Sequence, residues 1–297
     1  MASALVRGAG LIILSELLLA TMGAIIKAAS ESLPNEMLVW CRNLFGLAVL
    51  LPVVLRRGAS TLATRCLHLH LLRGCSGVAA MYCFFYTLSA IPLAEAVLLK
   101  LTAPFLLPVI ALLWLGERIP GVTALALVVG FGGVALVLQP AGTGVHPAAL
   151  AGLAGACLAA LAKVAIRRMR GEPGPRIVFY FGVIATGVSS VPLLWAWQTP
   201  SLQQLGWLAA LGGCATAAQL CLTQAYRLAP PGRIGPFTYV AVVFGSAYGW
   251  LFWGEVPGPA TVAGSALIIA AGVLALRPGP VAAGTQDMAP RAPEERS

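Results

Sequence analysis

Apolar residues fill most of this chain in runs of about twenty, which is the length of helix that crosses a bilayer. Short polar stretches separate the runs, and a chain with this pattern is expected to fold as a set of transmembrane helices. Ten segments fit that length: 9–29, 37–55, 71–89, 94–115, 120–139, 148–166, 177–197, 206–226, 234–253 and 259–276. The last residues, 277–297, are rich in Pro, Gly and charge and predict a disordered tail. The pattern therefore predicts an all-α membrane protein with ten transmembrane helices.

Composition supports this class of protein. Of the 297 residues, 59% are hydrophobic and only 10% are charged, whereas a soluble domain carries about a quarter of charged residues. The formal net charge is +9, but the cations lie in loops and form no basic face that would bind a polyanion. We therefore expect a lipid bilayer around the chain and no nucleic-acid partner.

Lys and Arg are distributed unevenly between the loops, and cytoplasmic loops carry the excess of these residues. Placing the N-terminus in the cytoplasm puts fifteen of the nineteen cations on that side. The remaining four, Lys27, Arg42, Lys100 and Lys163, lie within or at the ends of predicted helices. The sequence thus predicts a multi-pass protein of the inner (plasma) membrane with both termini in the cytoplasm.

Two halves of the chain repeat each other. "GERIPG" at 116–121 recurs as "GEVPGP" at 254–259, and "GGVALV" at 132–137 recurs as "AGVLAL" at 271–276. Five segments per copy is an odd number, so the second copy enters the membrane in the opposite orientation. This predicts two inverted five-helix repeats, 9–139 and 148–276.

These features resemble the EamA family of the drug/metabolite transporter superfamily. The resemblance rests on "FYTLSAIPLAEA" at 85–96, on "GER" after the fourth segment, and on their weaker echoes in the second half. It implies a ten-helix bundle in which helices 1, 3, 4, 6, 8 and 9 border a central cavity that moves small metabolites by alternating access. The second half departs from the pattern, because "GEV" replaces "GER" and Val242 stands where Pro104 stands in the first half.

Glu16 and Lys100 are charged residues inside apolar segments, where an ionised side chain is costly and usually functional. Glu16 shares a helix face with Ala20, Gly23 and Lys27, and Gly23 would let a solute or another backbone approach. Glu16 either binds a cationic group of the solute, titrates in proton coupling, or pairs with a cation of a neighbouring helix. Lys100 either holds a substrate carboxylate or pairs with Glu16 or Glu95.

Further polar residues and prolines complete the candidate site. The side chains expected to hydrogen-bond a solute are Tyr82, Tyr86, Gln219, Tyr239 and Ser246, with Tyr239 and Ser246 on one helix face. Residues expected to be structural or gating are Arg42, Pro104, Pro108, Glu117, Arg118 and Glu255. The two prolines should kink the fourth helix, and Arg42 should tether the second helix.

Other chemistry finds little support. The seven cysteines and three histidines show no metal-ligand or catalytic spacing, and no GxxxxGK[ST] motif for ATP occurs, so we expect no metal, no cofactor and no enzyme activity. We expect a secondary transporter that exports a small amino acid or an amino-acid-derived zwitterionic metabolite, for example an opine-like metallophore. An importer of a vitamin or nucleoside-like compound is the alternative, and short loops argue against a membrane-embedded enzyme. The sequence does not specify an oligomeric state.

The topology can be tested with a reporter. Alkaline phosphatase fused after residue 297 should be inactive, because an even number of helices returns the C-terminus to the cytoplasm and the enzyme folds only in the periplasm. A fusion with a cytoplasmic fluorescent reporter serves as the control. Phosphatase activity in the periplasm would mean an odd number of spans and would contradict the ten-helix prediction.

Overall fold

The computed structural model describes residues 2–55, 63–116, 119, 121–138, 146–169, 171–228 and 234–275. Within these residues the chain is helical, and helices cover each of the ten segments expected from hydropathy. The helices are α1 (Ala2–Ala29), α2 (Asn35–Leu55), α3 (Leu67–Ala90), α4 (Leu93–Lys100), α5 (Ala103–Leu115), α6 (Gly121–Leu138), α7 (Pro147–Arg168), α8 (Gly174–Ser190), α9 (Leu193–Ala196), α10 (Leu202–Leu228), the 3₁₀ helix η2 (Gly235–Tyr239), α12 (Val240–Trp253) and α13 (Pro259–Ala275).

Six of these helices are long and apolar enough to cross a membrane, judged by length and composition. They are α1, α3, the α4–α5 pair counted as one helix, α6, α7 and α10. Three shorter apolar helices lie at 176–190, 237–253 and 259–274. The length and apolar character of these helices, among the described residues, are those of a membrane protein.

The fourth predicted helix is divided by a turn, which we call the break. It consists of α4 and α5, which are separated by Leu101 and Thr102, and both of these residues keep backbone dihedrals in the right-handed helical region. Pro104 lies in the first turn of α5, where its missing N–H does not matter, and its ring is incompatible with an intact helix reaching back to Lys100. Thr102 Oγ1 donates a hydrogen bond to the Leu99 carbonyl at 2.6 Å and so satisfies one group at the break. Pro108 lies inside α5.

Two more predicted helices are interrupted. In the segment 177–197, α8 ends at Ser190, and the short helix α9 begins after Pro192. The segment 234–253 begins as the 3₁₀ helix η2 and becomes an α-helix only at Val240. The break in the fourth segment therefore has a counterpart in the ninth.

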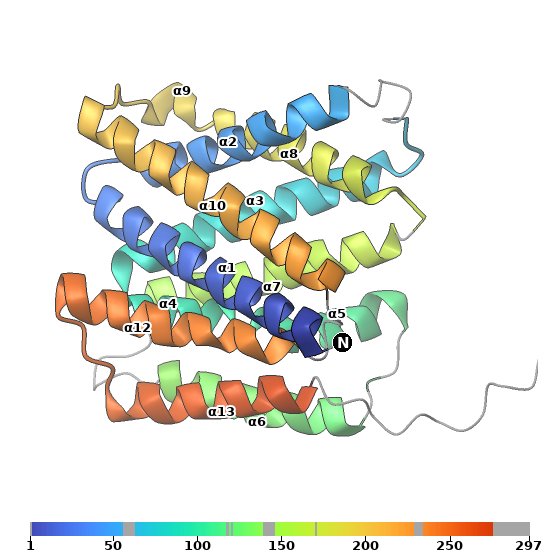
Figure 1. Cartoon of the computed structure of the whole chain (residues 1–297), viewed down its shortest axis with the longest axis vertical. Helices are drawn as coiled ribbons and strands as arrows, with labels where there is room; N and C mark the ends of the chain where they lie inside the picture. The colour runs from blue at the N-terminus through green and yellow to red at the C-terminus, as the bar shows by residue number, and fades with distance from the viewer. Residues whose placement is uncertain are drawn as a thin grey trace, which may run out of the picture.

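The helices lie side by side in layers (Figure 1). From top to bottom of the view, α10, α2 and α8 come first, then α1, α3 and α7, then α12 with α4 and α5, and finally α13 with α6. The main packing partners are α3 with α7, α1 with α10, α6 with α13, and α2 with α8. The main core includes Phe105, Leu88, Leu98 and Ile268, all fully buried.

The packing partners of the helices can be compared between the two predicted repeats, 9–139 and 148–276. The contact of α1 with α10 matches that of α7 with α3, the contact of α1 with α12 matches that of α7 with α5, and the contact of α10 with α2 matches that of α3 with α8. The pairs α6 with α13 and α2 with α8 join matching helices of the two halves.

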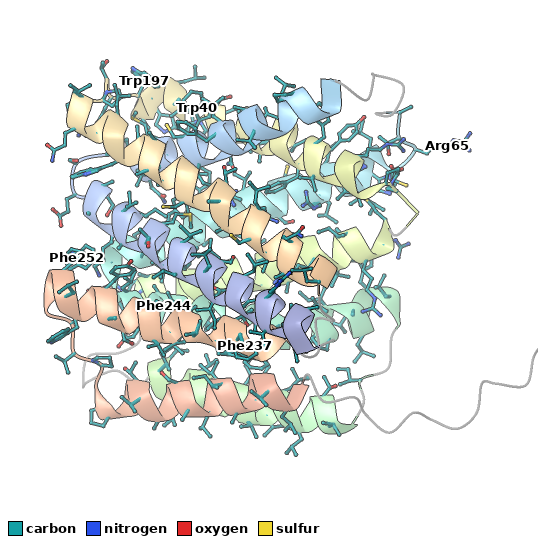
Figure 2. The ribbon with its side chains drawn as sticks, viewed as in Figure 1. Trp40, Arg65, Trp197, Phe237, Phe244 and Phe252 are labelled. Atoms are coloured by element: carbon teal, nitrogen blue, oxygen red, sulfur yellow. The ribbon has the colours of Figure 1, made fainter. Side chains whose placement is uncertain are left out.

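The two ends of the bundle differ in character. α1 begins and α13 ends at the same end of the bundle (Figure 1). Arg65 lies at that end, whereas Trp197 and Phe252 lie toward the opposite end (Figure 2). We call the first of these the Arg65 end. We call the opposite end the Glu255 end, because the loop between α12 and α13, which contains Glu255, lies there.

Helices α6 and α13 approach most closely at two glycines. A Cβ atom added at Gly133 would lie 2.8 Å from the Gly264 carbonyl oxygen, and one added at Gly264 would lie 2.6 Å from the Gly133 carbonyl oxygen. Small residues allow such backbone contact between membrane helices. No side chain fits at either position without moving a helix.

Gly133→Ala should therefore destabilise the protein by about 1–3 kcal/mol, because the new methyl group meets backbone atoms that cannot rotate away. Gly132→Ala is the matched control, since a Cβ at Gly132 has no atom within 4 Å. Thermal unfolding of the detergent-purified variants measures the difference. Equal melting temperatures for the two variants would mean that the close approach is absent.

Candidate functional site

Lys100 lies at the break in the fourth segment. It is the last residue of α4, so the carbonyl end of that helix favours its positive charge. Its ammonium group lies 5.3 Å from the centre of the Phe84 ring on α3. Many protein atoms lie around the Lys100 side chain, but its own surface is still exposed. The preceding Leu98 and Leu99 are buried. The break thus leaves a cation inside the bundle with accessible space around it.

Glu16 lies on α1 and is only 6% exposed. Its charge interacts with that of Lys100, although in the described part of the chain the two side chains do not reach salt-bridge distance. The neighbouring Ser15 Oγ donates a 2.9 Å hydrogen bond to the Ala218 carbonyl, which fixes this turn of α1 against α10. The two charges singled out in the sequence thus lie within electrostatic range of each other without forming an ion pair among the described residues.

Two further cations belong to this region. Arg42 on α2 is half-buried and donates to Asn43 Oδ1 at 3.1 Å and to Met81 Sδ at 3.5 Å, and its charge interacts with Lys100. Lys163 on α7 also interacts with Lys100. We call Glu16, Arg42, Lys100 and Lys163 the central charge cluster. No role was expected for Lys163, although a lysine inside the apolar run "LAALAKVAI" was a signal for one.

The predicted hydrogen-bonding residues are dispersed. The Tyr82 hydroxyl is buried and has no partner among the described residues, while Tyr86, one turn further along α3, is 45% exposed. Gln219 is exposed on α10.

Tyr239 is the last residue of η2 and directly precedes α12, which carries Ser246. The Tyr239 hydroxyl packs against α13 at Gly272, where a Cβ atom would clash with it.

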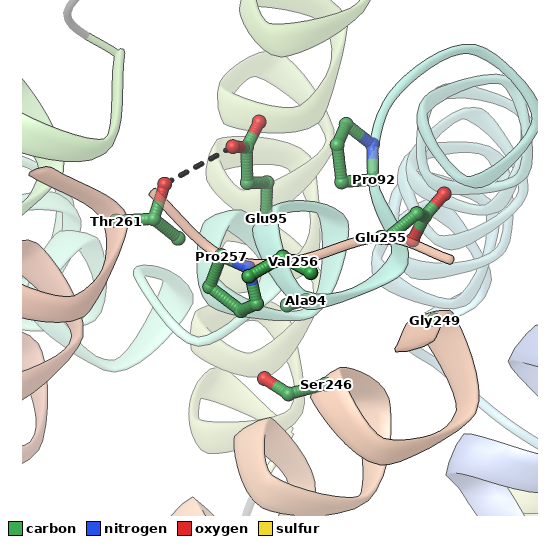
Figure 3. A pocket seen from close by; sticks show the side chains of 9 residues that line it. All are labelled: Pro92, Ala94, Glu95, Ser246, Gly249, Glu255, Val256, Pro257 and Thr261. Atoms are coloured by element: carbon green, nitrogen blue, oxygen red, sulfur yellow. Dashed lines mark hydrogen bonds between the residues drawn. The ribbon is translucent and has the colours of Figure 1, made fainter. Parts of the chain in front are cut away.

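Ser246 lines a small pocket near the Glu255 end, together with Glu95, Glu255 and Thr261 (Figure 3). Thr261 Oγ1 donates a hydrogen bond to Glu95 Oε1 at 3.1 Å. The pocket holds about 20 Å³, which is space for a single water molecule. It is too small for a metabolite.

Gly23 lies against protein. Atoms of Leu93 and Leu88 would be 3.5–4.0 Å from a Cβ at this position, so the Gly23 face of α1 packs on the junction between α3 and α4. The approach of a solute that the sequence suggested for this glycine is not seen.

Lys27 and Glu255 form an ion pair at the Glu255 end, with Nζ and Oε1 2.5 Å apart. Lys27 Nζ also donates to the Ile91 carbonyl at 2.8 Å, and the Leu93 N–H donates to Glu255 Oε2 at 2.8 Å. The Trp253 ring lies 5.5 Å from the Lys27 ammonium. This Lys27–Glu255 latch joins α1, the α3–α4 connection and the α12–α13 loop.

An apolar groove of about 490 Å³ lies beside the latch, between α1, α10 and α12. Its walls include Trp207, Phe252 and Trp253. Thr21 Oγ1 and Tyr248 Oη form a 2.9 Å hydrogen bond at its side. With apolar walls and no charged residue, the groove differs in chemistry from the central charge cluster.

At the Arg65 end, Glu172 pairs with Arg176 at 2.7 Å and accepts a hydrogen bond from Thr64 at 2.9 Å. The hydrogen bond from Arg176 lowers the pKa of Glu172 below its ordinary value. Glu117 and Arg118, which the sequence analysis assigned to caps or gates, lie outside the described residues.

The sequence model of the EamA-like transporter family matches residues 6–139 and again residues 146–277. The chain belongs to this family. It is therefore a membrane transporter.

Individual relatives are named for different transported substrates. The pseudopaline exporter CntI of Pseudomonas aeruginosa is 35% identical over 89% of this transporter and 94% of the relative. The riboflavin transporter of Rhizobium johnstonii is 29% identical over 78% of each chain. The S-adenosylmethionine uptake transporter of Rickettsia bellii is 26% identical over 77% of this transporter and 79% of the relative.

A solved crystal structure shares the fold. It superposes with a TM-score of 0.61 over 93% of this transporter and 96% of the other chain, at 23% sequence identity.

The latch can be dissected with two substitutions at one residue. Glu255→Gln keeps an oxygen that can accept from Leu93 N–H but loses the ion pair with Lys27, so it should cost about 1–3 kcal/mol, and Glu255→Ala should cost more because both contacts are lost. Melting temperatures of the purified variants measure the order. Glu31→Gln, an exposed carboxylate at the same end, is the control. Equal losses for Gln and Ala would show that the Leu93 contact contributes nothing.

Proposed function

We propose that this transporter exports a small amino acid or an amino-acid-derived zwitterionic metabolite from the cytoplasm across the inner membrane by alternating access. The observation that carries the proposal is the pair of opposite charges, Glu16 and Lys100, inside the bundle at a helix break. Discontinuous helices place charged ends and side chains at the substrate sites of secondary transporters. A zwitterion offers a carboxylate to Lys100 and an ammonium group to Glu16.

Similarity favours export of an amino-acid-derived compound such as an opine-like metallophore, because the pseudopaline exporter is 35% identical. An importer of a vitamin or nucleoside-like metabolite is the second candidate. It is supported by the riboflavin and S-adenosylmethionine uptake transporters, which are 29% and 26% identical. Chemistry on the substrate has no support from any of these relatives, so we infer that the protein is not an enzyme.

We further infer that the chain crosses the membrane ten times as two inverted repeats, 9–139 and 148–276. The family match in two parts, at 6–139 and 146–277, supports this division. The matching packing partners of the two halves support a pseudo-two-fold relation, and so does the break near the start of both α5 and α12.

Orientation is inferred from charge. Arg65 lies at the end of the bundle where α1 begins and α13 ends (Figures 1 and 2), and the positive-inside tendency would place that end in the cytoplasm. The Glu255 end then faces outward, and the Lys27–Glu255 latch closes it. We propose that the latch opens when substrate is released to the outside, which gives Glu255 the gating role suggested by its position.

Transport should be measured in proteoliposomes with a panel of labelled amino acids, opines, riboflavin and nucleosides, with and without a pH gradient. Accumulation of an amino acid or opine against its gradient supports the proposal, and selective transport of riboflavin or a nucleoside would favour the importer reading. Transport of none of these classes would contradict both.

Glu16→Gln tests whether the carboxylate couples transport to protons. If Glu16 exchanges a proton, the variant should fold normally, keep substrate-for-substrate exchange, and lose accumulation driven by a pH gradient, because Gln cannot titrate. Glu36→Gln, at the start of α2, is the control and should keep all three properties.

If Glu16 instead serves only to compensate Lys100, the same variant should lose folded protein, because removal of one partner leaves a charge uncompensated. The yield after size-exclusion chromatography separates the two roles. Unchanged yield together with unchanged pH dependence would contradict any role for Glu16.

A further inference from the structure

The apolar groove beside the latch lies on the outer side of α1. This helix packs against both α10 and α12, and its ribbon lies between theirs (Figure 1). The residues of α1 that line the groove are Thr21, Ala24, Ile25 and Ala28. They share a helix face that is turned about a third of a turn away from Gly23, which packs on α3 and α4. Leu14, further along the groove face, is exposed.

Exposed apolar side chains continue from the groove onto the two flanking helices. On α12 they are Trp250, Leu251 and Phe252, and on α10 they are Leu202 and Leu205. Helices that are apolar on their exposed faces meet lipid in a membrane transporter. The groove is therefore continuous with the lipid-facing surface of the protein.

The hydroxyl groups in the groove wall already have partners. Thr21 Oγ1 donates to the Leu17 carbonyl at 2.8 Å, so Tyr248 Oη is the donor in its 2.9 Å hydrogen bond with Thr21. No charged side chain lines the groove. A wall without charge and without a free hydroxyl proton suits an uncharged hydrocarbon, since a polar occupant would lose its hydrogen bonds to water there.

The length of the groove distinguishes a lipid chain from a partner helix. Between Thr21 and Ala28, α1 rises by about 10 Å. This is most of the roughly 15 Å of hydrocarbon that one leaflet contributes, whereas a transmembrane helix needs a path of about 30 Å. The hydrogen bond between Thr21 and Tyr248 bridges α1 and α12 where the groove ends. The groove thus matches one chain within one leaflet.

Trp253 belongs to both the groove and the latch. Its ring forms part of the groove wall and lies 5.5 Å from the Lys27 ammonium group. Phe252 contacts Trp253 edge-on and stacks on Tyr248, so the aromatic wall is one packed unit at the Glu255 end (Figure 2). An occupant of the groove would keep the Trp253 ring against Lys27 and preserve the cation–π contact.

We propose that an acyl chain of an outer-leaflet phospholipid occupies this groove and, through Trp253, stabilises the closed Lys27–Glu255 latch. The choice of leaflet rests on the proposed function, which places the Glu255 end outside, whereas the occupancy of the groove does not depend on it. A ligand that binds the closed arrangement more tightly than the open one shifts the population toward closure.

Occupancy is tested by filling the groove. Delipidated full-length protein in detergent is titrated with 1-palmitoyl-2-oleoyl-phosphatidylethanolamine, and the melting temperature and the bound lipid in native mass spectra are measured. The lipid should raise the melting temperature by about 3 °C at roughly tenfold excess over its dissociation constant. Ala28→Phe should lose both the shift and the bound lipid. Ala209→Phe is the matched control and should keep both, because Ala209 is exposed on α10 outside the groove.

Equal shifts and equal lipid counts in the wild type and Ala28→Phe would overturn the proposal. A wild-type dimer that Ala28→Phe dissociates would also overturn it, because a second copy of the chain would then occupy the groove. Ile25→Trp fills the same groove from the neighbouring turn and replaces Ala28→Phe if that variant does not fold.

The link to the latch is tested with Glu255→Gln. If the lipid favours the closed latch, loss of the ion pair should weaken lipid binding by about fivefold or more, since coupling between two sites is reciprocal. Glu31→Gln is the control and should bind lipid as the wild type does. An unchanged lipid affinity in Glu255→Gln would overturn the action on the latch.

These outcomes are separable from those of the proposed function. Lipid binding is measured without substrate, so its failure would reject the lipid and leave the transport proposal intact. Transport of no member of the metabolite panel, together with lipid binding that Ala28→Phe abolishes, would reject the proposed function and support the groove.

Discussion

The cost of placing an ionised side chain among apolar helices governs this structure. Most of the polypeptide avoids that cost by having no charge at all, and the exceptions are concentrated at two places. Lys27 meets the cost through Glu255 and the Ile91 carbonyl. Lys100 meets it in part through the end of α4 and the distant charge of Glu16. The first arrangement is an ion pair with backbone partners, whereas among the described residues Lys100 has no carboxylate at salt-bridge distance.

Hydropathy located the helices well, because about twenty consecutive apolar residues have few alternatives to a helix in a membrane. It did not locate the breaks. Pro104 was expected to kink the fourth helix, and the structure divides this helix by a turn at Leu101 and Thr102, where the Thr102 hydroxyl donates to the Leu99 carbonyl. Such local rescue by a side chain does not appear in a hydropathy pattern.

The candidate site was only partly predictable. The charges of Glu16 and Lys100 were evident from the sequence because charge in an apolar run is rare. The partner of Lys27 was not, since Glu255 lies in the other half of the chain and only tertiary packing brings it there.

The latch is built around Pro92. Lys27 holds the carbonyl just before this residue and Glu255 holds the N–H just after it, so separating the two side chains also strips two backbone groups of their partners. Moving the two side chains apart therefore costs the ion pair and both backbone hydrogen bonds together. The Glu255 end should consequently behave as an all-or-none closure, with two discrete arrangements and a defined barrier between them, and not as an opening that widens by degrees.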